Sequence, residues 1–294
     1  MKRFIITLFL IGSFCFQCNR AEAIKIGLLQ DVDKCYFGIA TEGQIVDTST
    51  SKQIIPINKL TTYKLEGHRS CIELRTEDDD RYKIDCKNIT IRTFDKSSFV
   101  CVKQKWYRGT VHIINNDGNL TVINDLGIED YVKGVTPAEM PSSWNYEALK
   151  AQAIAVRSYA IANIGKHGSK GYDLADDTQD QAYNGIMVET ERTNQAVNDT
   201  MGIVLTYDEH IISTMYSASA GGQTKSALES WGKDVPYLQS VKSFDDEVPA
   251  NGHGVGMTQH GAKNLADMGY NAYQILAYFY SNIHFAKLNP ETYK

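Results

Sequence analysis

The sequence predicts an α+β fold, in which a strand-rich N-terminal region precedes a mixed α+β domain. Short β-type runs separated by turn residues extend to about residue 123. An unbroken alanine-rich segment starts near residue 145, and helix-like and strand-like patterns alternate after residue 190. The 294 residues, 43% hydrophobic and 22% charged, have the composition of a folded globular protein and not of a disordered chain or a fibre.

The first 23 residues have the three parts of an export signal. Lys2 and Arg3 give a positive start, residues 4–16 are mostly apolar, and polar residues lead to Ala21-Glu22-Ala23. The apolar run is shorter than the ~20 residues that a membrane-spanning helix needs. We therefore expect residues 1–23 to be a signal peptide that is cleaved after Ala23 and exports the protein to the periplasm or the cell surface.

Short β-type runs dominate the region after the signal. Examples are residues 24–29, 36–40 and 82–86. The clearest unit is a hairpin, because residues 111–114 and 120–123 flank a turn in which Asp117-Gly118 supplies the positive φ that a tight turn favours. We expect a strand-rich N-terminal domain at 24–103 and a mixed α+β domain at 104–294.

Four of the six cysteines follow the predicted signal, namely Cys35, Cys71, Cys86 and Cys101. An even number of cysteines in an exported protein permits disulfides. Four cysteines allow three pairings, and the sequence does not choose between them. Buried free thiols are the alternative. These four cysteines contain no Cys-x-x-Cys pair, which argues against a structural zinc site.

Helical signals begin after the hairpin. Asn145 can cap a helix whose first turn carries Glu147, and the helix continues without a breaker to about Gly165. The many alanines favour the helix and allow a neighbour to pack closely. Further elements are expected as a helix at 191–201, strands at 203–207 and 211–216, and helices at 258–268 and 272–282.

Charge and motif content exclude several function classes. Lys and Arg total 30 against 35 Asp and Glu, a net charge of −5, so we expect no nucleic-acid partner. There is no G-x-G-x-x-G fingerprint in a βαβ unit and no Walker sequence, so we expect no nucleotide and no cofactor. His253 and His260 lack the H-E-x-x-H arrangement of zinc hydrolases, and no G-x-S-x-G motif surrounds Ser217 or Ser219.

Glu139 is the most unusual candidate for chemistry. It stands between Pro137 and Pro141, which restrict the backbone and would hold its carboxyl on a stiff, irregular segment ahead of the long helix. A surface acid in a proline-bracketed loop is the alternative. Lys150 and Arg157 lie two helical turns apart on nearly one face, where they can clamp a polar substrate, brace acidic loops or simply be solvated.

A glycine-rich segment, Gly252-His253-Gly254-Val255-Gly256, directly precedes a predicted helix. Its glycines allow a ligand to approach the backbone closely, and a flexible turn before the helix is the alternative.

Several motifs occur in an order that resembles one family. They are GIEDYVKGV at 127–135, AEMP at 138–141, ALKAQA at 148–153, RSYA at 157–160, DT at 177–178, QAYNG at 181–185, YSASAGG at 216–222 and GHGVGMTQ at 252–259. From about Trp106 to Phe285 the chain resembles the stage II sporulation protein D family. These are peptidoglycan lytic transglycosylases, and their relatives include amidase enhancers.

The resemblance implies a substrate groove in the mixed domain, with Glu139 as the catalytic acid. It implies substrate-binding positions near the groove at Lys150, Arg157, Gln181, Tyr183, His253 and Gln259. The implied reaction cleaves the β-1,4 bond between N-acetylmuramic acid (MurNAc) and N-acetylglucosamine (GlcNAc), and the 6-hydroxyl of MurNAc closes a 1,6-anhydro ring. Glu139 would act first as acid and then as base, so no second carboxylate is required.

The first step needs a protonated Glu139, which calls for an apolar setting. Val135, Met140 and Trp144 are candidates for that wall. A cation on the carboxylate would lower its pKa, so we expect Lys150 and Arg157 to bond substrate carbonyls or loop backbone instead.

By resemblance, the partners are peptidoglycan glycan strands and a cell-wall amidase. Some family members have cysteine and histidine residues near the Gln-x-Tyr motif that can hold zinc, but residues 173–180 here contain neither, so we expect no metal. The segment 239–251 is also shorter than in many members, which predicts a shortened groove wall. A non-catalytic amidase enhancer and a lysozyme-type hydrolase are the alternative functions.

Overall fold

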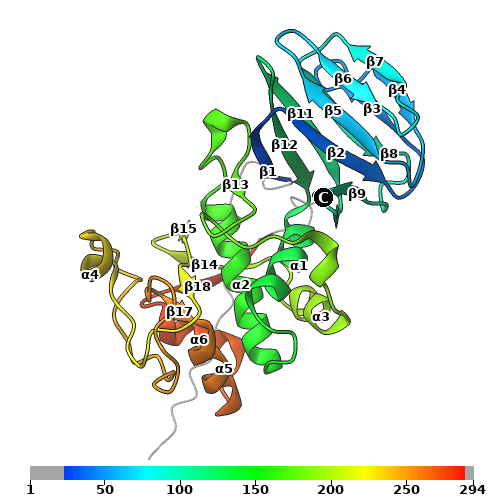
Figure 1. Cartoon of the computed structure of the whole chain (residues 1–294). Coiled ribbons are helices and arrows are strands. Elements are labelled where there is room, and N and C mark those ends of the chain that lie inside the picture. The colour runs from blue at the N-terminus through cyan, green and yellow to red at the C-terminus, as the bar shows by residue number, and fades with distance from the viewer. Residues whose placement is uncertain (1–22, 289–294) are drawn as a thin grey trace, which may run out of the picture.

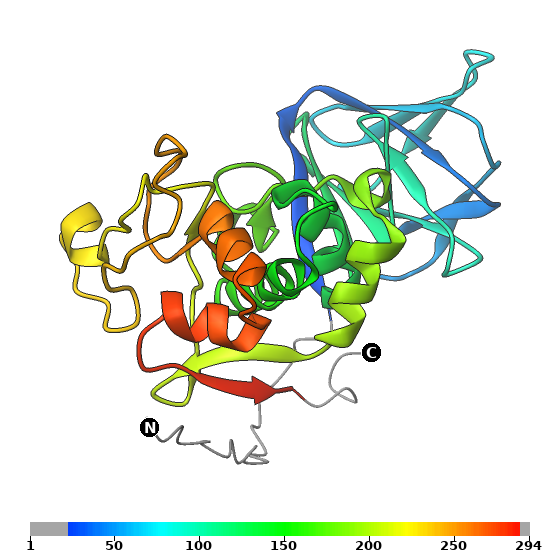
Figure 2. The ribbon, with the colours of Figure 1, turned by 90° about the horizontal axis from the view of Figure 1, so that it is seen from below.

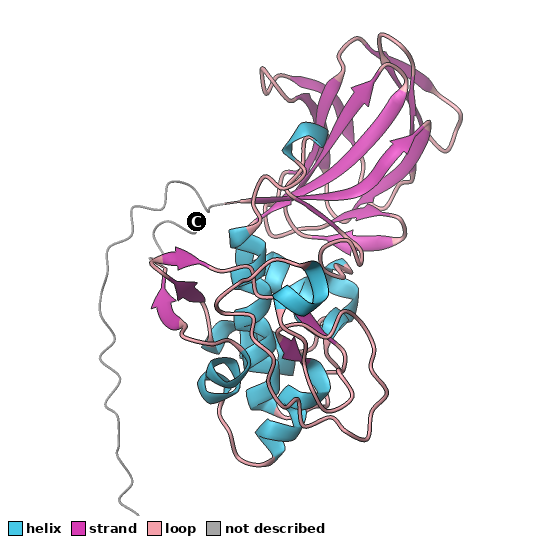
Figure 3. Ribbon diagram, turned by 90° about the vertical axis from the view of Figure 1, so that its left-hand side faces the viewer, coloured by secondary structure: helices cyan, strands magenta, loops and turns pink. Residues whose placement is uncertain are grey.

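The structure, a computed structural model, describes residues 23–288. A strand-rich part lies at the upper right of Figure 1 and a mostly helical part below it. Figure 3 shows the same division by secondary structure, and the α+β fold class is confirmed. The predicted signal at 1–23 lies outside the described residues except for Ala23. Within 23–288, no helix has both the length and the apolar character needed to cross a bilayer.

Two sheets form the strand-rich part. The first has seven strands in the order β13-β1-β12-β11-β8-β3-β4, and the second has six in the order β10-β9-β2-β5-β6-β7. The bounds are β1 Ile24–Val32, β2 Lys34–Ile39, β3 Gly43–Asp47, β4 Gln53–Ile57, β5 Tyr63–Gly67, β6 Ile72–Arg75, β7 Arg81–Ile84, β8 Asn88–Thr93, β9 Val100–Val102, β10 Lys105–Tyr107, β11 Thr110–Asn116, β12 Asn119–Leu126 and β13 Leu174–Ala175. Ile45 and Val122 of the first sheet and Ile39 and Leu65 of the second are fully buried in one core.

The sheets extend beyond the expected boundary at residue 103. β10 pairs with β9, and β11 and β12 lie inside the first sheet, so the strand-rich part ends at Leu126. The sheets reach Leu126 because the first strand needs β12 as its hydrogen-bonding partner, with Ile24 opposite Leu126. The predicted hairpin is confirmed, with Asp117 at φ 53° and Gly118 at φ 113° in its turn.

β13 connects the strand-rich part to the polar loop that follows the long helix. It lies parallel to β1, with Ile26 opposite Leu174. The backbone N–H of Lys25 donates to Asp173 Oδ2 at 2.8 Å. Position 27 has no room for a side chain, because a Cβ on Gly27 would lie 2.9 Å from the Tyr172 ring. The loop is thereby fixed to one edge of the seven-stranded sheet.

The helical part is built around α2 (Tyr146–Ala162), most of whose residues are buried. The cap is confirmed, since Asn145 Oδ1 accepts from Glu147 N at 3.1 Å. Helices α1, α3, α5 and α6 and strand β14 pack against α2, and Figure 2 shows α5 and α6 beside it. The bounds are α1 Ile128–Glu139, α3 Glu191–Asp199, α4 Ala227–Trp231, α5 Gln259–Asp267, α6 Ala272–Phe279, β14 Ile203–Tyr207, β15 His210–Ile211, β16 Tyr216–Ser217, β17 Met257–Thr258 and β18 His284–Lys287, with 3-10 turns at Gly168–Lys170 and Gly185–Val188.

The expected strand at 211–216 divides into two. His210–Ile211 pairs with β14, whereas Tyr216–Ser217 leaves that sheet and pairs in parallel with β17. This split matters for the site, because it carries Tyr216 toward the end of α1.

All four cysteines of the described part are free thiols. Cys35 and Cys71 are buried, and Cys86 and Cys101 are partly exposed. Burial raises the pKa of the Cys35 thiol to about 12, so this side chain behaves as a core residue and not as a nucleophile.

Candidate active site

Glu139 is the last residue of α1, and two prolines define this helix end. Pro137 lies inside the helix, and Pro141 disfavours helical geometry at the residue before it. Met140 is accordingly extended, at φ −134° and ψ 130°. The segment is thus not the irregular one that the prolines suggested, since the Met140 N–H still bonds to the Thr136 carbonyl at 3.0 Å. Glu139 is held by helical backbone up to its own position.

The Glu139 carboxyl receives hydrogen bonds from two segments far away in the sequence. The backbone N–H of Ala182 donates to Oε1 at 2.7 Å, and Gln259 Nε2 donates to Oε2 at 3.3 Å. Ala182 belongs to the loop after β13, and Gln259 is the first residue of α5. One carboxyl therefore joins α1, the polar loop and the start of α5.

Gln181 connects two tyrosines beside this carboxyl. Tyr131 OH donates to Gln181 Oε1 at 3.2 Å, and Gln181 Nε2 donates to Tyr216 OH at 2.9 Å. Gln181 itself is buried, with 1% of its surface exposed. A hydrogen bond from Tyr216 also acts on Glu139. The predicted residues Glu139, Gln181 and Gln259 thus lie together.

Burial raises the pKa of Glu139 above its ordinary value. The hydrogen bonds from Ala182, Gln259 and Tyr216 act in the opposite direction, because they favour the carboxylate. No other carboxylate is among the groups that shift this pKa. The Glu139 carboxyl therefore stays protonated to higher pH than that of an exposed glutamate.

The apolar residues expected near the carboxyl differ in exposure. Val135 and Met140 are fully buried. Trp144 is partly exposed, and its ring packs against His260 with centroids 4.8 Å apart. Since His260 follows Gln259 directly, Trp144 also lies at the N-terminal end of α5.

Gly256 lets the glycine-rich segment approach the site closely. It has φ 75°, and a Cβ there would lie 2.1 Å from the Met215 carbonyl oxygen. The close approach allows Met257–Thr258 to pair with Tyr216–Ser217. Thr258 Oγ1 then accepts from Gly261 N at 3.2 Å and caps α5. Both Tyr216 and Gln259 are placed by this short pairing.

His253 lies behind Tyr216 and not on Glu139. Its Nδ1 accepts from the Val255 N–H at 3.0 Å, and its ring packs against Trp231 with centroids 5.6 Å apart. Burial lowers the pKa of His253, with a smaller opposing effect from the Tyr216 backbone. The His253 ring is therefore neutral near pH 7 and supports the short strand β16, which carries Tyr216.

Arg157 is directed into the fold. It is fully buried, and its Nε and Nη2 donate to the two carboxylate oxygens of Glu129, both at 2.7 Å. Its Nη1 also donates to the Ile203 carbonyl at 3.1 Å. Lys150 pairs with Glu147 at 2.6 Å within α2. The structure therefore places neither cation on Glu139.

Tyr183 is also internal. Only 1% of it is exposed, and its OH donates to Asn124 Oδ1 at 2.8 Å. Its ring packs on Tyr131 with centroids 5.1 Å apart. Tyr183 thus lies one layer behind the Gln181 contacts.

The sequence did not single out Tyr216, Tyr131 or the Ala182 N–H. Tyr216 begins one of the ordered motifs and Tyr131 lies inside another, so the signal for both was present. A backbone donor has no side-chain signature, and only the fold reveals it. Within residues 23–288, no group of three or more His, Cys, Asp and Glu side chains could hold a metal ion.

Comparison with known proteins gives a family match over part of the chain. Residues 116–207 match the family model described as stage II sporulation protein. This range contains Glu139, Gln181 and Ala182, while Tyr216 and Gln259 lie beyond it. Residues 116–207 are thus similar to the stage II sporulation protein D family.

Three relatives are similar over parts of their length. An uncharacterised protein of Brachyspira hyodysenteriae is 43% identical over 136 residues, which cover 46% of this chain and 37% of the relative. The amidase enhancer of Bacillus subtilis is 43% identical over 115 residues, 39% of this chain and 15% of the relative. Stage II sporulation protein D of Bacillus subtilis is 36% identical over 144 residues, 43% of this chain and 42% of the relative. The chain thus matches less than half of the length of each.

Proposed function

We propose that this protein is a lytic transglycosylase that cleaves the β-1,4 bond between MurNAc and GlcNAc in peptidoglycan strands. The observation that carries the proposal is the Glu139 carboxyl. It is mostly shielded from water, its pKa is raised by burial, and it is held by the Ala182 N–H and by Gln259. The similarity to the stage II sporulation protein D family supports a role at the cell wall.

In the first step, protonated Glu139 gives its proton to the glycosidic oxygen. The bond from that oxygen to C1 of MurNAc breaks, GlcNAc leaves with a free 4-hydroxyl, and positive charge develops at C1. In the second step, the Glu139 carboxylate takes the proton of the MurNAc 6-hydroxyl, whose oxygen bonds to C1. The 1,6-anhydro ring closes and Glu139 is protonated again, so no water is consumed.

The surrounding donors suit this double role. The Ala182 N–H and the Gln259 amide stabilise the carboxylate that exists between the two steps, while burial favours the acid that begins the cycle. With burial alone, Glu139 would be a weaker acid than the first step needs. With the hydrogen bonds alone, it would be a weaker base than the second step needs. Their opposition keeps both forms of Glu139 accessible.

This chemistry and that of a lysozyme-type hydrolase differ in the number of carboxyl groups that they need. Retaining and inverting glycosidases place two carboxyl groups across the scissile bond, about 5–9.5 Å apart. A reaction in which the substrate hydroxyl is the nucleophile needs only one.

A second candidate function is a non-catalytic amidase enhancer that uses the same site to bind glycan strands. It is favoured by the similarity to the relative named amidase enhancer. In that case a cell-wall amidase is the partner. For either function we also propose export to the periplasm or cell surface, on the basis of the signal-like residues 1–23.

Digestion of purified glycan strands separates these functions. A transglycosylase releases products with anhydro ends, a hydrolase releases reducing ends, and a binding protein releases nothing, and mass spectrometry distinguishes the three. Glu139→Gln should lower the rate by about 10²–10⁴-fold and leave strand binding largely intact. Glu189→Gln is the matched control, because Glu189 is a shielded glutamate that pairs with Arg108 away from Glu139. Full activity of Glu139→Gln would reject the proposal.

A further inference from the structure

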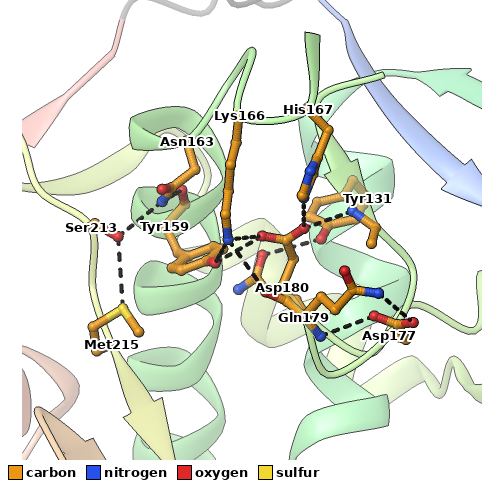
Figure 4. A network of polar contacts seen from close by, with 12 residues as sticks. Tyr131, Tyr159, Asn163, Lys166, His167, Asp177, Gln179, Asp180, Ser213 and Met215 are labelled. Carbon is orange, nitrogen blue, oxygen red and sulfur yellow. Dashed lines mark hydrogen bonds and ion pairs between the residues drawn. The ribbon is translucent and has the colours of Figure 1, made fainter. Parts of the chain in front are cut away.

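Asp180 lies in a network of polar contacts with Tyr159, Lys166 and His167 (Figure 4). Its side chain has 0% exposure. Lys166 Nζ lies 2.6 Å and Tyr159 OH 3.0 Å from Oδ1, while His167 Nε2 and the Ala175 N–H lie 2.8 Å from Oδ2. These groups come from α2, from the segment after α2 and from β13. The function proposed above assigns no role to any of them.

The donors keep Asp180 charged despite its burial. Burial acts to raise the pKa of Asp180, but the hydrogen bonds from Ala175, Lys166 and His167 outweigh it, so this pKa lies below its ordinary value. A carboxylate shielded from water is costly unless it is fully paired. Each donor is therefore a restraint on the position of Asp180.

The restraint on Asp180 is transmitted to the active site through the backbone. Asp180 directly precedes Gln181, which contacts Tyr216, and Ala182, whose N–H holds Glu139 at 2.7 Å. Beyond Ala182 the chain is fixed again, since the Tyr183 N–H donates to the Asp176 carbonyl at 3.2 Å. The two residues that touch the Glu139 environment are thus held between two anchors.

We propose that Asp180 is a positioning residue for the Glu139 carboxyl, acting through the Ala182 N–H and the Gln181 side chain. Its effect on catalysis rests on the proposed function of Glu139. Its effect on the geometry and ionisation of Glu139 does not, so the two can fail separately.

Other ionisable groups also face these two carboxyls. Around Asp180 they are Lys166, His167, Tyr159, Tyr131 and Tyr172. Around Glu139 they are Tyr131 and Tyr216. Asp180 is not among the groups that shift the pKa of Glu139, so a change at Asp180 reaches Glu139 through the loop backbone and the Tyr131–Gln181 hydrogen bond.

Asp180→Asn tests the proposal with little change of volume. The amide keeps one acceptor for the Ala175 N–H but no longer attracts Lys166 and His167. The loop loosens, the hydrogen bond from Ala182 weakens, and Glu139 loses a group that favours its charged form. The pKa of Glu139 should rise. It is read by carbon-13 NMR of protein labelled at the glutamate carboxyls, with the Glu139 signal assigned by its loss in Glu139→Gln.

The same variant should lower kcat on glycan strands by about 10–100-fold with little change in KM, because a small displacement of a reacting group is enough to slow the reaction. Glu189→Gln, which alters another shielded ion pair, should change neither the Glu139 pKa nor kcat. If Asp180→Asn does not fold, Lys166→Met removes one partner of the same carboxylate at a 39% exposed side chain and should shift both quantities in the same direction by less.

A folded Asp180→Asn protein whose Glu139 pKa is unchanged or lowered would overturn the positioning role. If the NMR shift is found but the unsubstituted protein cleaves no strands, the positioning role stands and the proposed function is rejected.

Discussion

Substitution of Arg157 by methionine separates a structural role from the substrate-binding role that family resemblance implies. The guanidinium is fully buried and makes two parallel hydrogen bonds of 2.7 Å to Glu129. Glu129 has only 15% of its side chain exposed. Removing one partner of a buried pair leaves an uncompensated charge and costs about 3–5 kcal/mol. A typical domain has only about 5–15 kcal/mol in total, so the loss is large.

The assay is denaturant unfolding of Arg157→Met, Glu129→Met and the double variant. The double variant should recover most of the loss, because neither charge remains to be desolvated. At a temperature where Arg157→Met is still folded, its KM for glycan strands should stay within a few-fold of that of the unsubstituted protein. If the single variant keeps its stability and KM rises more than tenfold, the structural reasoning is wrong and Arg157 contacts substrate.

Two further predictions concern Glu139 and Gly256. Since the pKa of Glu139 is raised in the folded state, its ionisation opposes folding as pH rises above the ordinary value of 4.5. Glu139→Gln should therefore raise the melting temperature near pH 7 and give no gain below about pH 4, as measured by calorimetry; a gain equal at both pH values would contradict this. Gly256→Ala should lose about 2–5 kcal/mol in urea unfolding, because it combines a φ of 75° with a 2.1 Å contact to Met215. Gly269→Ala, at φ 93° with nothing within 4 Å, is its control and should lose only about 1 kcal/mol.

Features that depend on a few adjacent residues could be predicted from the sequence. The Asp117-Gly118 turn and the Asn145 cap are local, and each forms as expected. The helix α1 was missed because Pro137 reads as a helix breaker, although tertiary packing keeps the chain helical through Glu139. The pairing of Ile24 with Leu126, which brings β12 into the first sheet, has no local signature in the sequence.

In the site, too, only features that depend on adjacent residues or on resemblance could be predicted. Glu139 was singled out by its proline-bracketed motif, and Gln181 and Gln259 were singled out by resemblance. The ion pair of Arg157 with Glu129 joins two helices, and a cation on a helix face looks the same whether it points inward or outward. The donor at Ala182 is a backbone N–H, which almost every residue type supplies, so the sequence does not mark its position.

The place of β1 between β13 and β12 has a consequence for biogenesis. This strand leaves the ribosome first, yet its two neighbours, β12 and β13, are made much later. Until they arrive, both of its edges are open to pairing with other chains. We therefore expect newly made protein to need shelter by a holdase chaperone, and N-terminal truncations that remove β1 to yield inclusion bodies.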